Sequence, residues 1–389
     1  MSFREIKTSQ AKELLEYFTR REREFLKFTR ALVETESPSG YVEGIRAVVA
    51  LLADYARVID GVTSVERIES EQYGEHLRVR AFDTISDAEQ ILIVGHTDTV
   101  HELGSWKNLW REAQKCVFAP GIFDMKANCA LAIEAILALS VLNLRPQRPV
   151  VLLLTCDEEI GSMSGRPLIE EEAKRAACAL VLEPPAAGGR VKTERKGTGI
   201  FTLEARGRAA HAGLEPEKGA SAVLEIARQI ERLHSLNDAA QGTTINVGTV
   251  QGGTRVNVVA AEAKAEIDVR FSTATEAKRI NEAIRNLKPF DERVQLTVSG
   301  GINRPPLERS AGVVELYNHA RSVASAFDYE LGEARVGGAS DGNFVAAVGT
   351  SVLDGLGIDG DGAHAAHEHI KTEDIARRGA LLAGLLATL

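Results

Sequence analysis

Residues 91–98, ILIVGHTD, join a run of aliphatic side chains to a histidine and an aspartate. Two similar aliphatic runs follow, VVLLL at 150–154 and ALVLE at 179–183. Branched aliphatic residues at successive positions are typical of central parallel strands that helices cover on both faces. Between the first two runs, residues 127–142 are rich in alanine and leucine and predict a helix. This alternation of strand and helix predicts an α/β sheet.

The composition is that of an ordinary globular protein, with 44% hydrophobic and 26% charged residues. A chain of 389 residues exceeds the size at which one hydrophobic core usually stops growing, so we expect two domains. The net charge of -9 leaves no basic excess for binding a nucleic acid. No apolar run approaches the ~20 residues that a membrane helix needs, so we expect no membrane partner.

The four cysteines form no CxxC pair and are too few to crosslink a chain of this length. We therefore expect reduced thiols, most of them packed in the interior. The first 25 residues are charged from the start and lack the apolar segment of a secretion signal. Both observations predict a cytoplasmic protein.

A different pattern begins after about residue 196. Residues 261–271 alternate strictly between apolar and charged side chains, which indicates a half-solvated antiparallel strand. Together with the neighbouring segments it predicts the order β-α-β-β-α-β, at 197–205, 219–234, 243–250, 261–271, 275–287 and 294–299. We therefore expect an α/β domain formed by residues 1–196 and 303–389, interrupted by an inserted α+β domain at 197–302.

Polar residues that could bind a metal follow each of the three buried runs. His96 and Asp98 follow the first, Glu158 and Glu159 the second, and Glu183 closes the third. Ligands bind at the carboxyl edge of open α/β sheets, where such residues would meet. A histidine at a strand end is commonly structural, but adjacent carboxylates after an apolar strand imply a nearby cation, because burying an unpaired anion is costly.

Two loops contribute further candidates. Asp124 lies in GIFDMK before the 127–142 helix, where it could simply cap the helix. His364 and His367 lie in the glycine-rich stretch GLGIDGDGAHAAHE. These motifs can provide a set of two histidines and three carboxylates, which suits a pair of zinc-type metals.

The ordered motifs GHTDTV, PGIFDMK, TCDEEIGS, VLEP and GAHAAHE resemble the zinc metallopeptidase family of acetylornithine deacetylase, succinyl-diaminopimelate desuccinylase and glutamate carboxypeptidase. The resemblance covers essentially the whole chain, and PGIFDMK and HAGLEPEKG are most similar to the bacterial glutamate carboxypeptidases. It implies a mostly parallel-sheet catalytic domain with an inserted lid and dimerisation domain, and a homodimer formed through that insert.

The resemblance also implies roles at the metal centre. His96, Asp124 and Glu183 would hold one zinc ion, and Asp124 would bridge to a second ion held by His364 and Glu159. Asp98 would orient His96, and Glu158 would act as the general base on the metal-bridging water. The peptide bond after Asp124 is expected to be cis. The family spacing, a histidine four residues before a glutamate, favours His364 over His367, and cobalt or manganese could occupy the same ligands.

Other candidates lie in the predicted insert and near the C-terminus. His211 could be a surface histidine, but the resemblance implies that it stabilises an oxyanion. Arg270 could be a solvated charge; the resemblance implies that it grips a substrate carboxylate with Asn246. Arg255 and Asn257 are weaker candidates. Gly338 lies in GGASDG at 337–342, which resembles the family's glycine-rich loop near the substrate, where glycine allows a close backbone approach.

These features predict a carboxypeptidase-like amidohydrolase that releases a C-terminal amino acid from a small N-acyl or peptidyl substrate. An N-acyl-amino-acid deacylase and a di- or tripeptidase are alternatives on the same scaffold. A non-catalytic binding protein is a third alternative, which the presence of all five proposed ligands and Glu158 disfavours.

Overall fold

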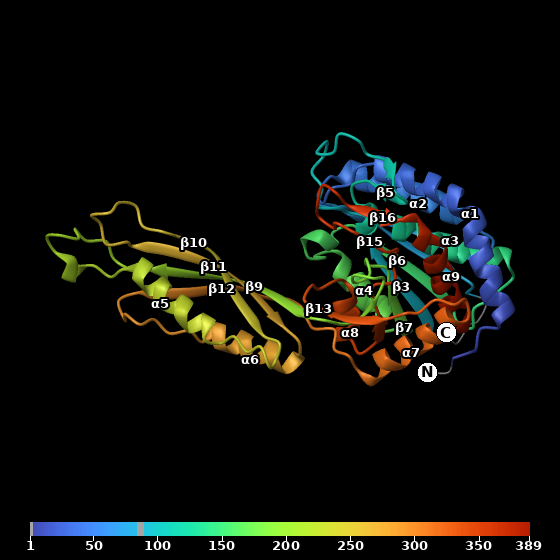
Figure 1. Cartoon of the computed structure of the whole chain (residues 1–389). Helices are drawn as coiled ribbons and strands as arrows, with labels where there is room; N and C mark the ends of the chain where they lie inside the picture. Colours follow the sequence, from blue (N-terminus) through green and yellow to red (C-terminus); the bar gives the residue numbers. More distant parts are fainter. Residues whose placement is uncertain (1–2, 84–88) are drawn as a thin grey trace. The chain divides into compact units, whose positions relative to one another are not determined.

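The computed structural model describes residues 3–83 and 89–389 (Figure 1). Two compact units make up the chain. The first contains Met1–Thr193, Arg309–Val336 and Ser340–Leu389, and the second contains Glu194–Glu308 and Gly337–Ala339. The chain therefore leaves the first unit, builds most of the second, and returns.

A six-stranded sheet with the order β1-β2-β6-β3-β7-β14 forms the centre of the first unit. Strands β6, β3, β7 and β14 run parallel. At one edge β2 pairs antiparallel with β6, and β1 pairs antiparallel with β2. The predicted α/β sheet is therefore confirmed, with its three aliphatic runs as adjacent strands. The strands are β1 (Val62–Ser70), β2 (Gly74–Ala81), β3 (Gln90–His96), β6 (Val150–Thr155), β7 (Ala176–Val181) and β14 (Ser351–Leu353).

Helices cover this sheet on both faces. Ile91 and Ile93 of β3 belong to the main hydrophobic cluster, whereas Leu92 and Val94 are buried on the opposite face, because successive strand residues point in opposite directions. Helix α3 packs against β3 and is itself in contact with α1 and α9, whereas α4 and α8 pack against β7. The helices of this unit are α1 (Thr8–Glu34), α2 (Val42–Arg57), α3 (Ala127–Val141), α4 (Gly165–Ala173), α7 (Ala311–Ser325), α8 (Gly342–Ala347) and α9 (Thr372–Thr388).

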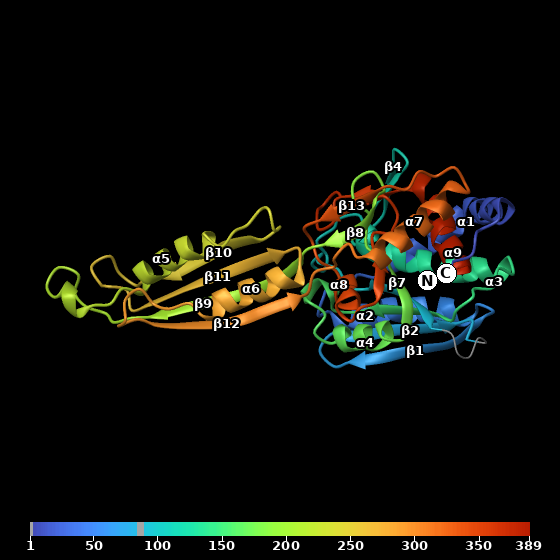
Figure 2. The same ribbon diagram turned by 90° about the horizontal axis from the view of Figure 1, so that it is seen from below.

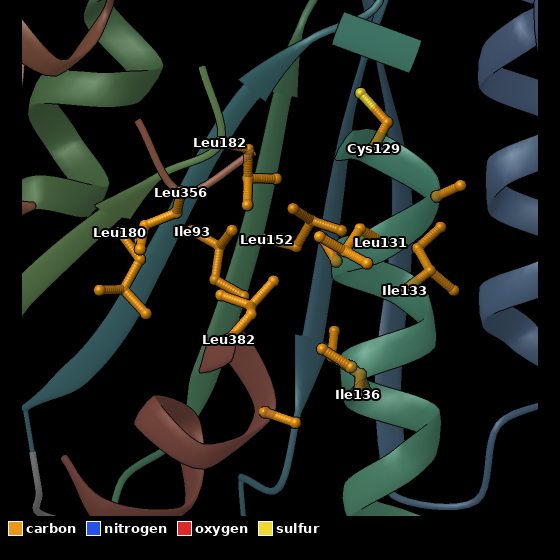
Figure 3. Close-up of a cluster of buried hydrophobic side chains, with 14 of the residues drawn as sticks. Ile93, Cys129, Leu131, Ile133, Ile136, Leu152, Leu180, Leu182, Leu356 and Leu382 are labelled. Carbon is orange, nitrogen blue, oxygen red and sulfur yellow. The ribbon is translucent and has the colours of Figure 1, made fainter. Parts of the chain in front are cut away.

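The core forms where α3 meets the sheet. Figure 3 shows Ile93, Leu152 and Leu180 of three neighbouring strands in one cluster with Leu131 and Ile136 of α3. Full burial of one such aliphatic side chain contributes about 1.5–3 kcal/mol to the free energy of folding. The parallel strands are thus fixed relative to one another by the packing of their side chains as well as by their hydrogen bonds.

Short strands connect distant parts of the first unit. Strand β16 (His369–Lys371) pairs with β5 (Cys116–Phe118), which brings the C-terminal glycine-rich loop beside the segment before Asp124. The remaining short strands are β4 (Arg111–Ala113), β8 (Val191–Arg195), β13 (Glu333–Val336) and β15 (Gly360–Asp361). Two single turns, η1 (Ile122–Lys126) and η2 (Glu158–Ile160), follow β5 and β6.

The second unit is a four-stranded antiparallel sheet with the order β10-β11-β9-β12. Its elements follow the predicted order β-α-β-β-α-β, and Figures 1 and 2 show both helices on one face of the sheet. The apolar residues of the 261–271 segment are buried beneath these helices, as the alternation predicts. The elements are β9 (Gly197–Arg206), η3 (Pro216–Lys218), α5 (Ala222–His234), β10 (Thr244–Gly252), β11 (Glu262–Phe271), α6 (Ala274–Arg285) and β12 (Gln295–Arg304).

The cysteines, the helix lengths and the end of strand β7 can be compared with the sequence predictions. All four cysteines are free, and three of them are buried, as predicted for packed thiols. Within the described residues, no helix combines the length and the apolar character needed to cross a membrane. The predicted strand 179–183 ends earlier, at Val181, so that Glu183 lies two residues beyond the strand.

Candidate active site

The parallel register of three strands brings their polar continuations together. His96, the last residue of β3, is paired with Thr155 at the end of β6. On the other side of β3, Val94 is paired with Val181 of β7. Because the two strands are parallel, His96 and Glu183, each two residues further on, lie at the same level. The edge where ligands bind in open α/β sheets therefore carries a histidine flanked by carboxylates.

Asp124 lies between two histidines. Its Oδ1 is 3.2 Å from Nε2 of His96, and its Oδ2 is 3.5 Å from Nε2 of His364. Asp124 sits in the η1 turn after Gly121, which has a φ of 65° that favours glycine. The Asp124–Met125 peptide bond is cis, as expected. Each oxygen of this carboxylate thus faces a different imidazole.

A second carboxylate accompanies each histidine. Nε2 of His96 lies 3.7 Å from Oε1 of Glu183, and Nε2 of His364 lies 3.2 Å from Oε2 of Glu159. The cluster thus has two halves that share Asp124, and they match the two ligand sets that the resemblance implied. At His367 the backbone carbonyl accepts a hydrogen bond from His369.

The donor set suits bound cations. Oε1 of Glu159 is buried and has no hydrogen-bond partner among the described residues, although an orphaned carboxylate oxygen is costly. Burial raises the pKa of Glu159 above its usual range, and hydrogen bonds to Asp124 and Glu159 raise the pKa of His364 to about 10. Protons here compensate for crowded negative charge, which divalent cations would neutralise instead. Imidazole nitrogens and carboxylate oxygens are ligands that zinc accepts.

Asp98 contacts His96 and the backbone of Glu158 and Glu159. It is fully buried, and its Oδ1 lies 3.4 Å from Nδ1 of His96, whose nearest acceptor is the backbone oxygen of Asp98 at 3.0 Å. The backbone N–H groups of Glu158 and Glu159 donate to its two oxygens at 3.2 Å each. Ser39 donates to Oδ2 at 2.7 Å. Nothing in the sequence indicated this role for Ser39, which lies in a turn motif.

Glu158 begins the η2 turn after β6 and is buried. One of its oxygens belongs to a group of possible ligand atoms with His96 and Glu183, all within 4.8 Å of one another. The loop that carries it is tied to Asp341, which accepts hydrogen bonds from Ser162 and, at 2.9 Å, from Thr155. Asp341 was part of a motif that predicted only a glycine-rich loop.

A separate buried group, His76, Cys156 and Asp157, also has the residue types of a metal site. Its polar atoms are used within the protein. Asp157 accepts hydrogen bonds from the backbone N–H groups of Ser164 and Gly165 at the start of α4, and His76 accepts one from the N–H of Cys156. This group therefore fastens α4 to the end of β6.

Other predicted residues lie in the second unit. Asn246 on β10 is paired with Asp268 on β11, and Arg270 forms an ion pair with Asp268 at 3.0 Å. His211 is exposed, and its Nδ1 accepts hydrogen bonds from the N–H groups of Gly213 and Leu214 at 3.2 Å. A neutral His211 must therefore carry its hydrogen on Nε2, which makes that nitrogen a hydrogen-bond donor.

The remaining substrate candidates are held mainly through their backbones. The carbonyl of Asn257 accepts a hydrogen bond from Ala212, and that of Arg255 accepts one from Val258. The carbonyl of Gly338 accepts from Nη1 of Arg195 at 3.2 Å. Packing leaves open space around Gly338, because an added Cβ would be 3.9 Å from its nearest neighbour, the same Nη1.

Comparison with known proteins adds to this geometry. A family model described as peptidase family M20/M25/M40 matches residues 92–388. Carboxypeptidase G2 of Pseudomonas sp. (strain RS-16) is 27% identical over 374 residues, which cover 94% of this chain and 89% of the relative. Acetylornithine deacetylase of Myxococcus xanthus is 28% identical over 322 residues, covering 76% of this chain and 79% of the relative.

Two solved structures share the fold. Aminopeptidase PepT of Bacillus cereus matches with a TM-score of 0.78 at 22% identity, covering 94% of this chain and 98% of that one. The YXEP protein of Bacillus subtilis, described as a dinuclear metal-binding peptidase, matches with a TM-score of 0.69 at 14% identity, covering 96% of this chain and 98% of that one.

Proposed function

Because the chain belongs to peptidase family M20/M25/M40, we propose that it is a two-zinc hydrolase acting next to a free carboxylate. The bond cleaved is the amide that joins a C-terminal amino acid to an acyl group or a short peptide. Membership of the family makes the chain a hydrolytic enzyme of the metallopeptidase class. The observation that carries the finer proposal is Asp124, whose two oxygens face His96 and His364.

In this proposal, each half of the cluster holds one zinc ion. His96 and Glu183 serve the first, His364 and Glu159 the second, and Asp124 serves both. The buried Oε1 of Glu159 supports this division, because a carboxylate oxygen in the interior needs a donor or a cation. When bound, the metals would lower the pKa of a water molecule and polarise the carbonyl of the substrate.

Glu158 then performs the proton transfers. Its carboxylate accepts a proton from the attacking water and delivers it to the nitrogen of the leaving amino acid. The backbone N–H of Glu158 donates a hydrogen bond to Asp98, which fixes the position of the Glu158 backbone. Asp98 also lies beside Nδ1 of His96, which leaves Nε2 of that ring to face the ligand cluster.

The second unit would supply recognition, as an inserted lid and dimerisation domain. A guanidinium matches a carboxylate with two parallel hydrogen bonds, so Arg270 is the proposed clamp for the free carboxylate, with Asn246 beside it. The Nε2–H of His211 would donate to the oxyanion of the tetrahedral intermediate. Strand β10 lies at the edge of its sheet and is largely exposed, which fits a homodimer formed through this unit.

The central test replaces Glu158 by glutamine. We expect the variant to retain its metal content and to lose about 10²–10⁴-fold in kcat, the usual contribution of a general acid–base residue. The control is Glu134→Gln, because Glu134 is also buried but pairs with Arg21 instead. Full hydrolytic activity in the Glu158→Gln variant would contradict the mechanism, and a wild-type protein that binds no divalent metal would contradict the metal centre.

Substrate choice separates carboxypeptidase from deacylase and di- or tripeptidase. The similarity to acetylornithine deacetylase favours a deacylase as the second candidate. A panel of N-acyl amino acids, dipeptides and tripeptides, scored by the amino acid released, distinguishes these activities. Each substrate is paired with its C-terminal amide, and we expect the amide to lose most of kcat/KM. Equal rates for acid and amide would refute recognition of a free carboxylate.

A further inference from the structure

Glu368 is completely buried in the first unit, and its carboxylate accepts hydrogen bonds on both oxygens. Its Oε1 accepts from the backbone N–H groups of Phe123 and Asp124, each at 2.9 Å. Its Oε2 accepts from the backbone N–H of Gly121 at 2.9 Å and from Nε2 of His101. One carboxylate therefore holds three backbone N–H groups at the start of the turn from which Asp124 projects.

The side-chain donor, His101, is itself oriented. Its Nδ1 accepts a hydrogen bond from the indole N–H of Trp106 at 3.3 Å, and the two rings meet edge to face. An acceptor role for Nδ1 leaves the hydrogen on Nε2, where it is donated to Glu368. His101, oriented by Trp106, thus completes the set of donors around this buried carboxylate.

Glu368 also joins two parts of the proposed metal centre. It lies four residues after His364 in the same loop, while its side chain grips the turn of Asp124. Its backbone N–H bonds back to Ala365, and its carbonyl accepts from Ala119. His364 and Asp124, whose side chains are 3.5 Å apart, are therefore connected through one buried residue.

We propose that Glu368, with His101 as its side-chain donor, is a positioning residue that fixes Asp124 and His364 in the geometry needed to bind two metals. The inference rests on the proposed function, since it assigns these residues to a metal centre. The carboxylate of Glu368 binds the backbone of residues 121–124, so its influence on the ligands passes through that backbone. Outer partners of this kind typically change metal affinity by about 10–100-fold.

The test is a metal titration of the full-length protein after removal of metal with a chelator. Cobalt serves as the probe, because its visible absorption also reports the ligand geometry. In Glu368→Gln an amide NH2 replaces one carboxylate oxygen and meets two N–H donors, so at least two hydrogen bonds are lost. We expect cobalt affinity to fall about 10–100-fold and the absorption bands to shift. The matched control, Glu134→Gln, should leave both unchanged.

A second pair of variants tests His101 and covers the case in which Glu368→Gln does not fold. His101→Gln retains an N–H donor for Glu368, whereas His101→Phe removes it. We expect His101→Phe to weaken cobalt binding and His101→Gln to restore it towards the wild-type value. Equal binding by the phenylalanine variant and the wild type would overturn the role of His101.

The outcomes separate this inference from the proposed function. A wild type that binds two cobalt ions, with a folded Glu368→Gln variant that binds them as tightly, would overturn the positioning role alone. A similar loss in Glu134→Gln would also overturn it, because the effect would then follow from general destabilisation. A wild type that binds no cobalt would overturn the proposed function, whatever the variants do.

Discussion

Replacing Asp98 by asparagine should destabilise the protein and weaken metal binding by amounts that its neighbours define. If the oxygen of the introduced amide takes the place of Oδ1, it still accepts from the N–H of Glu158, and the NH2 group must then take the place of Oδ2. At the Oδ2 position Ser39 can rotate its hydroxyl and accept instead, but the N–H of Glu159 is left without an acceptor. One orphaned buried N–H costs about 1–3 kcal/mol, and we expect that loss in the free energy of unfolding without metal.

The effect on metal binding should be at the lower end of the usual range. Nδ1 of His96 keeps its nearest acceptor, the backbone oxygen of residue 98 at 3.0 Å, so the ring should remain oriented. The ring loses the negative charge 3.4 Å from Nδ1, which makes the imidazole a more basic and therefore stronger metal ligand. We therefore expect about a tenfold loss of affinity, equivalent to about 1.4 kcal/mol.

Urea unfolding with and without zinc separates the two effects. Without metal, the midpoint should shift by the cost of the orphaned N–H; with zinc in excess, the variant should lose a further ~1.4 kcal/mol of metal-dependent stabilisation. Asp54→Asn is the control, because Asp54 is an exposed helix residue that pairs with Arg57. The reasoning is refuted if Asp98→Asn matches this control in both conditions, or if metal affinity falls without any change in the metal-free protein.

Two more predictions concern regions away from the site. Gly44→Ala in α2 should destabilise the protein by about 1–3 kcal/mol, although alanine normally favours a helix, because the new Cβ would lie 2.1 Å from the backbone oxygen of Glu36; a stabilised variant in chemical unfolding would contradict this. Burial holds the pKa of His319 below its usual value, so on acidification the unfolded state takes up the proton first. The free energy of unfolding should therefore fall as the pH drops below about 6.5, by at most about 1.4 kcal/mol per pH unit. His319→Gln should lack this contribution. If the free energy of unfolding changes equally with pH in the variant and the wild type between about pH 7.5 and 5.5, the prediction is refuted.

The central sheet could be predicted well from the sequence because its strands are buried on both faces. Ile91, Leu92, Ile93 and Val94 each pack against a helix layer, so the chain carries an unbroken aliphatic run. Strand 261–271 was equally clear, since one face is exposed and its side chains alternate. The end of β7 was less clear, because Leu182 is buried like a strand residue although the strand has already ended.

The ligand cluster could be predicted as a set of residue types at strand ends, but its supporting contacts could not. Ser39 and Asp98 are 59 positions apart, and Glu368 lies 244 positions from the N–H of Asp124 that it accepts from. A single sequence contains no periodic signal for such pairs. The motif GAHAAHE marks Glu368 only by its spacing from His364, and no motif marks His101, because an isolated polar residue in a loop has many ordinary explanations.

The two ends of the second unit are held together by hydrogen bonds within that unit. Arg195 and Leu307, near the two ends of this unit, are joined by a pair of backbone hydrogen bonds of 3.0 Å. On the side of the first unit, Thr193 and Arg309 both bind the carboxylate of Glu333. Each unit therefore ties its own chain ends together, so replacing residues 194–308 by another segment would leave the contacts at the ends of the first unit in place.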